Sequence, residues 1–188
     1  MKGMSNMYNF YRPYPCPYTP MYNLYYRRCP YPYWFNTPMY NSDFWKQPIE
    51  LKDYGPEPFV VNIDEATKQN TNYRTALWTG ENLQVTLMSI KVGGDIGLEI
   101  HPTVDQFIRI EEGQGIVRMG DSKDNLDFEA RVYDDYAIMI PAGKWHNLIN
   151  TGSKPLKLYA IYAPPEHPRG TIHKTKEDAE ADERNYSY

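Results

Sequence analysis

Several features are scarce or missing in this 188-residue chain, and each absence narrows the function. No apolar run approaches the roughly 20 residues that span a membrane, so no membrane segment is expected. The N-terminus lacks the basic-then-apolar layout of a secretory signal, which favours a cytoplasmic protein. The net charge is only −4, which disfavours a nucleic-acid partner. Cys16 and Cys29 could close a loop or cross-link chains, and two cysteines alone do not establish a redox compartment.

The first 41 residues have a composition of their own. They hold ten of the 18 tyrosines, seven of the 16 prolines and both cysteines. So many prolines remove backbone donors and exclude a regular helix or an interior strand, so residues 1–41 are predicted to be a disordered, low-complexity tail. Four basic residues and no acids give this tail a charge of +4, which leaves −8 on the remainder.

Two interpretations of the tail stay open. It is either a disordered extension whose tyrosines rest on the domain, or an adhesive segment, because phenols stack, donate hydrogen bonds and can be coupled oxidatively. Tails rich in Tyr, Pro and Met resemble those of proteins in the spore coat of endospore-forming bacteria. That resemblance implies a coat or surface assembly as partner and location.

After a linker at residues 42–58, short apolar segments alternate with Gly, Pro and Asn turns, which predicts an all-β barrel or sandwich over residues 59–165. The expected strands are 59–63, 74–78, 83–91, 96–101, 106–112, 115–119, 127–132, 136–140, 145–150 and 156–162. A helical turn at 64–69 would have Asn62 or Asp64 as its N-cap. Residues 166–188 are interpreted as a loop and a short solvated helix capped by Thr175.

Candidate metal ligands cluster in two stretches. Glu99 and His101 are two residues apart, so on a strand both side chains point to the same face. Gln106 and His146 can join them if the strands close into a barrel. A carboxylate, two imidazoles and an amide oxygen converging on one interior point would suit a divalent metal.

The spacing of these residues resembles the two motifs of the cupin superfamily over roughly residues 59–165. Positions of the first motif fall on Gly93, Glu99, His101, Gln106 and Gly113, and those of the second fall on Asp135, Pro141, Gly143, His146 and Asn150. The resemblance implies a single small jelly-roll barrel that dimerises through its sheets. Domains of this kind are often labelled mannose-6-phosphate isomerase-like, a label that rests here on resemblance alone.

Three positions depart from the family pattern. Glu99 replaces the first histidine, Gln106 replaces the glutamate, and Asp135 replaces the opening glycine of the second motif. The family would use three imidazoles and one carboxylate, whereas this set has two imidazoles, one carboxylate and one amide oxygen. The single negative charge is kept, and Mn²⁺, Fe²⁺, Zn²⁺ or Ni²⁺ would fit. Asp105 is the rival to Gln106, which is preferred because it shares a period of two with Ile108 and Ile110.

The alternative is a barrel without metal, in which Glu99 pairs with His101 or His146, because an unpartnered buried carboxylate would be costly. Other polar residues are interpreted as structural. Tyr162 is expected to be a core tyrosine with a solvated hydroxyl. The remaining expectations place His167 and His173 in a surface loop, with His173 as an outside candidate for acid–base chemistry, and place Arg74 and Arg109 in solvent.

The side of the Glu99 strand opposite the ligands would carry Ile96, Leu98 and Ile100, an apolar row that needs a cover such as a second subunit. Two functions follow. The first is a metal-dependent enzyme, such as a sugar-type isomerase or an oxygenase, with a small-molecule substrate and Glu99 as general base. The second is a structural or binding scaffold that the tail attaches to a coat or surface assembly.

Overall fold

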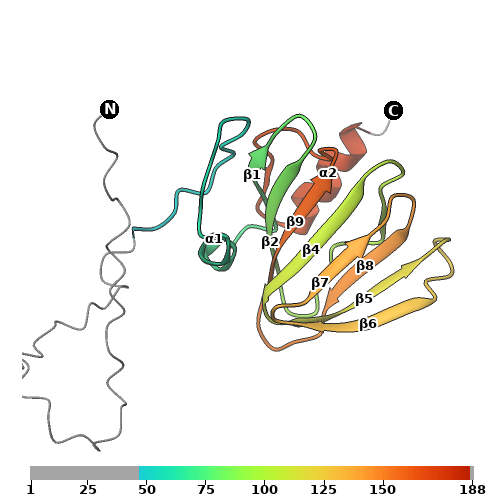
Figure 1. Cartoon of the computed structure of the whole chain (residues 1–188). Helices are drawn as coiled ribbons and strands as arrows, with labels where there is room; N and C mark the ends of the chain where they lie inside the picture. The colour runs from blue at the N-terminus through green and yellow to red at the C-terminus, as the bar shows by residue number, and fades with distance from the viewer. Residues whose placement is uncertain (1–46, 187–188) are drawn as a thin grey trace, which may run out of the picture. The chain divides into compact units, whose positions relative to one another are not determined.

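The computed structural model describes residues 47–186, and the predicted tail, with its two cysteines, lies outside them. Two antiparallel sheets enclose the core (Figure 1). The six-stranded sheet has the order β10-β1-β2-β9-β4-β7, and the four-stranded sheet has the order β3-β8-β5-β6. The strands are β1 (Arg74–Thr79), β2 (Gln84–Ile90), β3 (Glu99–Ile100), β4 (Asp105–Glu112), β5 (Gln114–Gly120), β6 (Phe128–Tyr133), β7 (Ala137–Ile140), β8 (Trp145–Asn150), β9 (Leu156–Ala163) and β10 (Ile172–His173). The all-β jelly-roll prediction is confirmed.

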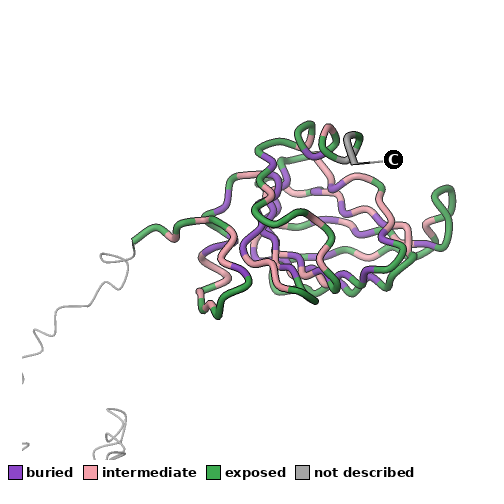
Figure 2. The backbone as a smooth tube through the Cα atoms, turned by 90° about the horizontal axis from the view of Figure 1, so that it is seen from above, coloured by how far each residue is buried: buried purple, intermediate pink, exposed green. Residues whose placement is uncertain are grey.

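The main core fills the space between the sheets, and it follows the alternation of side chains along each strand. Ile108, Ile110 and Leu158 from the larger sheet meet Val117 and Leu148 from the smaller one. Burial alternates strictly along β8, as expected for a strand with one face on a core. In Figure 2 the buried positions are concentrated along the strands and the exposed ones in the loops.

The outer face of the larger sheet is covered by the chain itself. A second apolar cluster joins Leu77, Leu87 and Tyr159 of that sheet to Ala66 of α1 (Ile63–Gln69) and to the segment that precedes it. Asn62 is the N-cap of α1, because its side-chain oxygen accepts from the Glu65 N–H, which confirms one of the two predicted caps. Both faces of this sheet are therefore buried at β1, β2 and β9.

Three details of the predicted elements are wrong. Residues 59–62 form no strand, and Ile63 already begins α1, because this segment packs on the sheet instead of pairing with it. The short strand β10 was missed, since two residues in a Pro/Gly-rich stretch carry no period. Ile96 does not belong to an outward row: it is 5% exposed and lies in the main core, so the apolar row that argued for a subunit cover is not continuous.

The chain closes with α2 (Lys176–Tyr186), whose first turn is capped as predicted by the Thr175 hydroxyl, which accepts from the Asp178 N–H. The helix is acidic along most of its length, and Ala179 contributes its apolar contact to the main core. Neither described helix is long and apolar enough to cross a membrane.

Candidate metal centre

Strand pairing brings the two halves of the candidate site together. Glu99 on β3 lies directly opposite His146 on β8 in the antiparallel register. His101 follows β3 by one residue, and its ring centroid lies 5.4 Å from that of His146. One potential ligand atom from each of the three residues lies within 4.8 Å of the others. The local spacing in the sequence places Glu99 beside His101, whereas His146 arrives only through the sheet.

One carboxylate oxygen is the centre of this cluster. Glu99 Oε1 lies 3.2 Å from His146 Nε2 and 3.4 Å from His101 Nε2. The opposite nitrogen of each ring also faces an acceptor. His146 Nδ1 is 2.9 Å from the Lys144 carbonyl oxygen, and His101 Nδ1 is 3.1 Å from Glu166 Oε1.

These contacts fit a cation better than they fit neutral imidazoles. A neutral imidazole has one N–H donor, and at His146 the Lys144 carbonyl requires that donor at Nδ1. His146 Nε2 then presents a lone pair to the negatively charged Glu99 oxygen, and the same holds at His101 if Glu166 takes its Nδ1 proton. A metal ion would satisfy all three inward atoms, with the Nδ1 contacts fixing the rings as outer-shell partners commonly do.

Without a metal ion, the positive charge that faces the Glu99 carboxylate has to come from a proton on an imidazole. Burial acts to lower the pKa of His101, but the carboxylates of Glu166 and Glu99 outweigh it and raise this pKa to about 9. Burial likewise acts to raise the pKa of the Glu99 carboxyl, yet the adjacent rings of His101 and His146 and the charge of Arg74 bring it well below its ordinary value. The Glu99 carboxyl is therefore ionised both with and without a bound metal ion.

Arg74 was expected in solvent, and that expectation is wrong. Its side chain is 1% exposed, and it reaches from β1 into the interior, close enough for its charge to lower the pKa of the Glu99 carboxyl. A buried guanidinium needs anionic or acceptor partners, and the Glu99 carboxylate supplies negative charge nearby. The sequence signal was weak, because one arginine at the start of a strand is usually solvated.

Gln106 and Asp105 lie on opposite faces of β4. Gln106 is 3% exposed and pairs across the sheet with Tyr162, whose ring contacts that of His101 at 5.6 Å between centroids. Gln106 Oε1 is buried and has no hydrogen-bond partner among the described residues. Asp105 is exposed and accepts instead from the Ala142 N–H. The inward residue is thus Gln106, and its orphaned oxygen is available to a ligand on this side of the interior.

The loop after β9 closes over the same interior. The Gln84 side chain holds this loop with two hydrogen bonds: its amide nitrogen donates to the His167 carbonyl oxygen at 2.8 Å, and its oxygen accepts from the His167 N–H at 2.9 Å. The carboxylate of Asp53 holds the end of the loop through the Gly170 N–H. Glu166 is carried by this loop to His101, a role the sequence reading missed because Gln84 and His167 are 83 residues apart.

Two residues in this region contradict their expected exposure. The His167 ring packs edge-on against Tyr162, and its Nε2 is buried without a partner among the described residues, so this loop residue is half-buried rather than fully exposed. Burial, reinforced by the charge of Arg74, lowers the pKa of His167 to about 2, which leaves a neutral imidazole. Tyr162 is 0% exposed, so its hydroxyl is not solvated, and burial raises the pKa of that phenol.

His173 and Arg109 are not among the three residues of the cluster. His173 is 6% exposed rather than on the surface, and its Nε2 pairs with Asp182 of α2 at 2.8 Å. Arg109 is part-exposed, close to its expected state, and pairs with Glu111 and Asp135. Asp135, which replaces a motif glycine, keeps the left-handed backbone of that position with φ of 68°. Asp135 can replace the motif glycine in this turn, because Asp tolerates the left-handed conformation better than most residues.

Known proteins agree with this architecture. Residues 86–162 match the model of the Cupin domain family Cupin_2. The chain is 59% identical over 174 residues to the uncharacterized protein YrkC of Bacillus subtilis (strain 168), covering 80% of this chain and 94% of that protein. It is 44% identical over 115 residues to the uncharacterized protein L612 of Acanthamoeba polyphaga mimivirus, covering 61% and 70% respectively.

Among solved structures, the crystal structure of BH2720 from Bacillus halodurans shares 66% sequence identity with a TM-score of 0.69, and the match covers 69% of this chain and 98% of that chain. The matched family region contains Glu99, His101, Gln106 and His146, the residues considered above as ligands. On the combined evidence of the two motifs, the paired antiparallel sheets and these relatives, the chain belongs to the cupin superfamily.

Proposed function

We propose that this protein is a metal-dependent cupin that binds a divalent cation through Glu99, His101 and His146 and acts on a small polar molecule in the barrel. The observation that carries the proposal is the arrangement around Glu99 Oε1, which faces two Nε2 atoms whose rings are engaged by acceptors on the far side. The buried oxygen of Gln106 is the fourth proposed donor. Such a mixed N/O set suits Mn²⁺, Fe²⁺, Zn²⁺ or Ni²⁺.

When bound, the ion would act as a Lewis acid on a carbonyl or hydroxyl oxygen of the substrate. The chain's own groups then have separate tasks. Glu166 and the Lys144 carbonyl orient the two imidazoles. Glu99 is proposed as the nearest base, and the neutral imidazole of His167 could hold a proton at its unpartnered Nε2. The loop fixed by Gln84 limits the access of water to this interior.

A sugar-type isomerase is one reaction class that this arrangement would support, and an oxygenase is another. Both use a metal to polarise or bind oxygen atoms, and the choice depends on the ion and on the substrate. Dimerisation through the sheets and a cytoplasmic location belong to the same proposal. In the alternative proposal the barrel is a scaffold, and the Tyr/Pro-rich tail of residues 1–41 attaches it to a spore coat or surface assembly.

The first test is the metal content of the purified full chain by plasma mass spectrometry, after supply of each of the four ions. We expect near-stoichiometric metal in the wild type and its loss in His101→Ala and His146→Ala. The matched control is His173→Ala, which removes a buried histidine outside the cluster and should retain the metal. Absence of bound metal under every condition would overturn the metalloenzyme proposal and favour the scaffold.

The two proposals are separated by deleting residues 1–41. A metal-dependent enzyme should keep its metal content and any activity found in a screen with that metal. A scaffold should lose its localisation or its assembly into a larger structure, measured by fractionation of cells and spores. A deletion that changes neither localisation nor assembly would count against the scaffold.

A further inference from the structure

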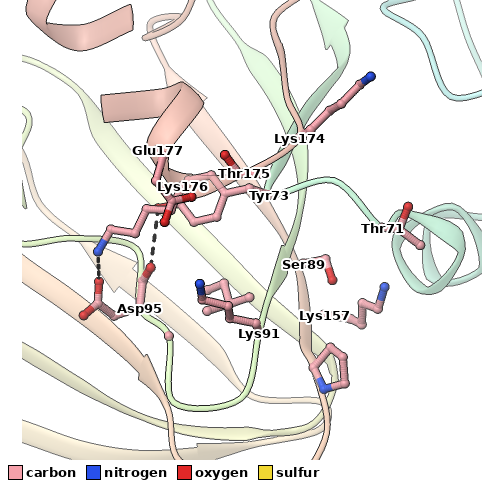
Figure 3. Close-up of a pocket in the computed structure, with 13 residues that line it drawn as sticks. Thr71, Tyr73, Ser89, Lys91, Asp95, Lys157, Lys174, Thr175, Lys176 and Glu177 are labelled. Atoms are coloured by element: carbon pink, nitrogen blue, oxygen red, sulfur yellow. Dashed lines mark hydrogen bonds and ion pairs between the residues drawn. The ribbon is translucent and has the colours of Figure 1, made fainter. Parts of the chain in front are cut away.

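A pocket of about 360 Å³ lies apart from the candidate metal centre, and none of its lining residues is a proposed ligand (Figure 3). It is formed where the end of β2 and the start of β9 meet the segment that leads into α2. Its size is within the range of small-molecule sites.

Positive charge dominates this pocket although the whole chain is acidic. Four lysines and two carboxylates line it, so it carries a net charge of +2 in a chain of net charge −4. Asp95 is already engaged, because its carboxylate binds the Lys176 amine and accepts from the Gly97 N–H at 2.8 Å. Figure 3 shows this ion pair at one side of the pocket. Glu177, the other lining carboxylate, lies near enough to Lys91 for their charges to interact, so the lysines exceed the carboxylates by two charges.

Among the four lining lysines, Lys157 has the most unusual environment. It is only 9% exposed, and its amine donates to the Asn70 carbonyl oxygen, which uses one of three N–H donors. Burial lowers the pKa of Lys157, while the charge of Glu112 opposes that change. A buried ammonium beside a neutral carbonyl is costly unless an anion compensates it. A ligand anion in the pocket would supply that compensation.

The apolar part of the lining is fixed. The Tyr73 ring is held in place, because its hydroxyl donates to the Ile96 carbonyl oxygen at 2.9 Å. Ile90 is 1% exposed, and Pro155 adds a rigid ring nearby. In Figure 3 Tyr73 stands between the Asp95–Lys176 pair and Lys174, whose amine extends outward at the rim. A ligand that contacts both the lysines and the apolar side chains has an anionic group and an apolar body.

From this combination we infer that the pocket binds a small organic anion, a phosphate monoester or carboxylate joined to an aromatic or aliphatic group. The charged group lies with Lys157, and Lys91, whose amine points the other way in Figure 3, reaches it by rotation about its side-chain bonds. The apolar body packs on Tyr73 and Ile90. Lys174 reaches the anion by rotation about its side-chain bonds. The inference does not depend on the proposed metal function, because the two sites share no residue.

The test is isothermal titration calorimetry of the full chain with phenyl phosphate and benzoate, which separate the two anion types. Benzyl alcohol lacks the charge and inorganic phosphate lacks the ring. We expect one of the aromatic anions to bind at least tenfold more tightly than both of these. Equal binding of benzyl alcohol would overturn the role of the lysines, and equal binding of inorganic phosphate would overturn the role of the apolar surface. No binding at millimolar concentration would overturn the site.

Substitution of the lining lysines tests whether the anion binds in this pocket. Lys157→Met keeps the side-chain length and removes the charge, and it should weaken the bound aromatic anion at least tenfold. Lys91→Met, at an exposed position, provides the same test if Lys157→Met does not fold. The control Lys123→Met removes an exposed lysine that does not line the pocket and should leave the affinity unchanged. Unchanged affinity in both pocket variants would refute the assignment. His146→Ala should bind the anion normally, which separates this result from failure of the metal proposal.

Discussion

The metal-free protein should lose stability as the pH rises through the slightly alkaline range, because of His101. Its side chain is 7% exposed between the carboxylates of Glu99 and Glu166, and its pKa in the folded state is about 9 against 6.5 for the ordinary residue. The folded protein therefore holds a proton that the unfolded chain releases near pH 6.5. Stability rises with pH only where the unfolded state binds more protons, and here the folded state binds more.

The magnitude follows from the two pKa values. Each pH unit between the folded and unfolded pKa is worth about 1.4 kcal/mol. The interval from 6.5 to about 9 therefore corresponds to about 3 kcal/mol in the free energy of unfolding. This contribution is fully present below pH 6.5 and is lost as the pH rises to about 9. The Glu99 carboxylate is part of the same interaction and adds no second contribution in this range.

Bound metal should remove this pH dependence. A metal-bound imidazole is neutral at the ligating nitrogen, so metal binding releases the proton that His101 holds. Unfolding by urea, measured at pH 6.5, 7.5, 8.5 and 9.5, should show the decline in the presence of a chelator and not with saturating metal. His101→Gln should flatten the chelator curve, and the control His173→Gln should keep its slope. A flat wild-type curve in chelator would refute the protonated His101 and the charge balance argued for the site.

Three further predictions concern the core, the second motif and the fourth ligand. Leu158→Ala at a fully buried position should lower the free energy of unfolding by about 3 kcal/mol in urea titrations, whereas Val60→Ala, at 96% exposure, should change it by under about 0.5 kcal/mol. Asp135→Val should destabilise by roughly 1–2 kcal/mol because of its φ of 68°, and Asp135→Gly should not; equal losses in both variants would instead indicate the pair with Arg109. Gln106→Glu should tighten metal binding in competition with a chelator and destabilise the metal-free protein, since it adds a second carboxylate to the buried interior; unchanged affinity would exclude position 106 as a ligand.

The sequence predicted the elements of the fold because each is encoded locally. Short segments of alternating polarity between Gly, Pro and Asn turns mark the strands, and nine of the ten expected strand ranges overlap strands of the two sheets, although range 96–101 is a strand only at Glu99–Ile100. The exception, residues 59–63, is apolar because it packs on the outer face of a sheet. An apolar run without a partner strand has the same local pattern as a paired one.

The candidate ligands could be predicted from the sequence, and the residues that surround them could not. Glu99 and His101 share a face through the period of a strand, and the second motif supplied His146. Gln106 was preferred to Asp105 for the same periodic reason, and it lies in the interior while Asp105 is exposed. These residues sit in regular strands or directly beside them, where sequence spacing fixes direction.

Glu166, His167 and Arg74 show what only the tertiary structure decided. The first two lie in a Pro-rich segment that looks like an ordinary surface loop. Gln84, 83 residues from His167 in the chain, holds this segment where Glu166 contacts His101 and His167 packs on Tyr162. Arg74 is buried because its strand is covered on both faces, a fact that local polarity does not reveal. The sequence by itself determined most of the strands and turns and the shared face of Glu99 and His101, since these follow from backbone period and residue chemistry, whereas His146 joins them only through strand pairing. The protonation of that cluster was decided by the fold, because electrostatics depends on distances in space between residues that are remote in sequence.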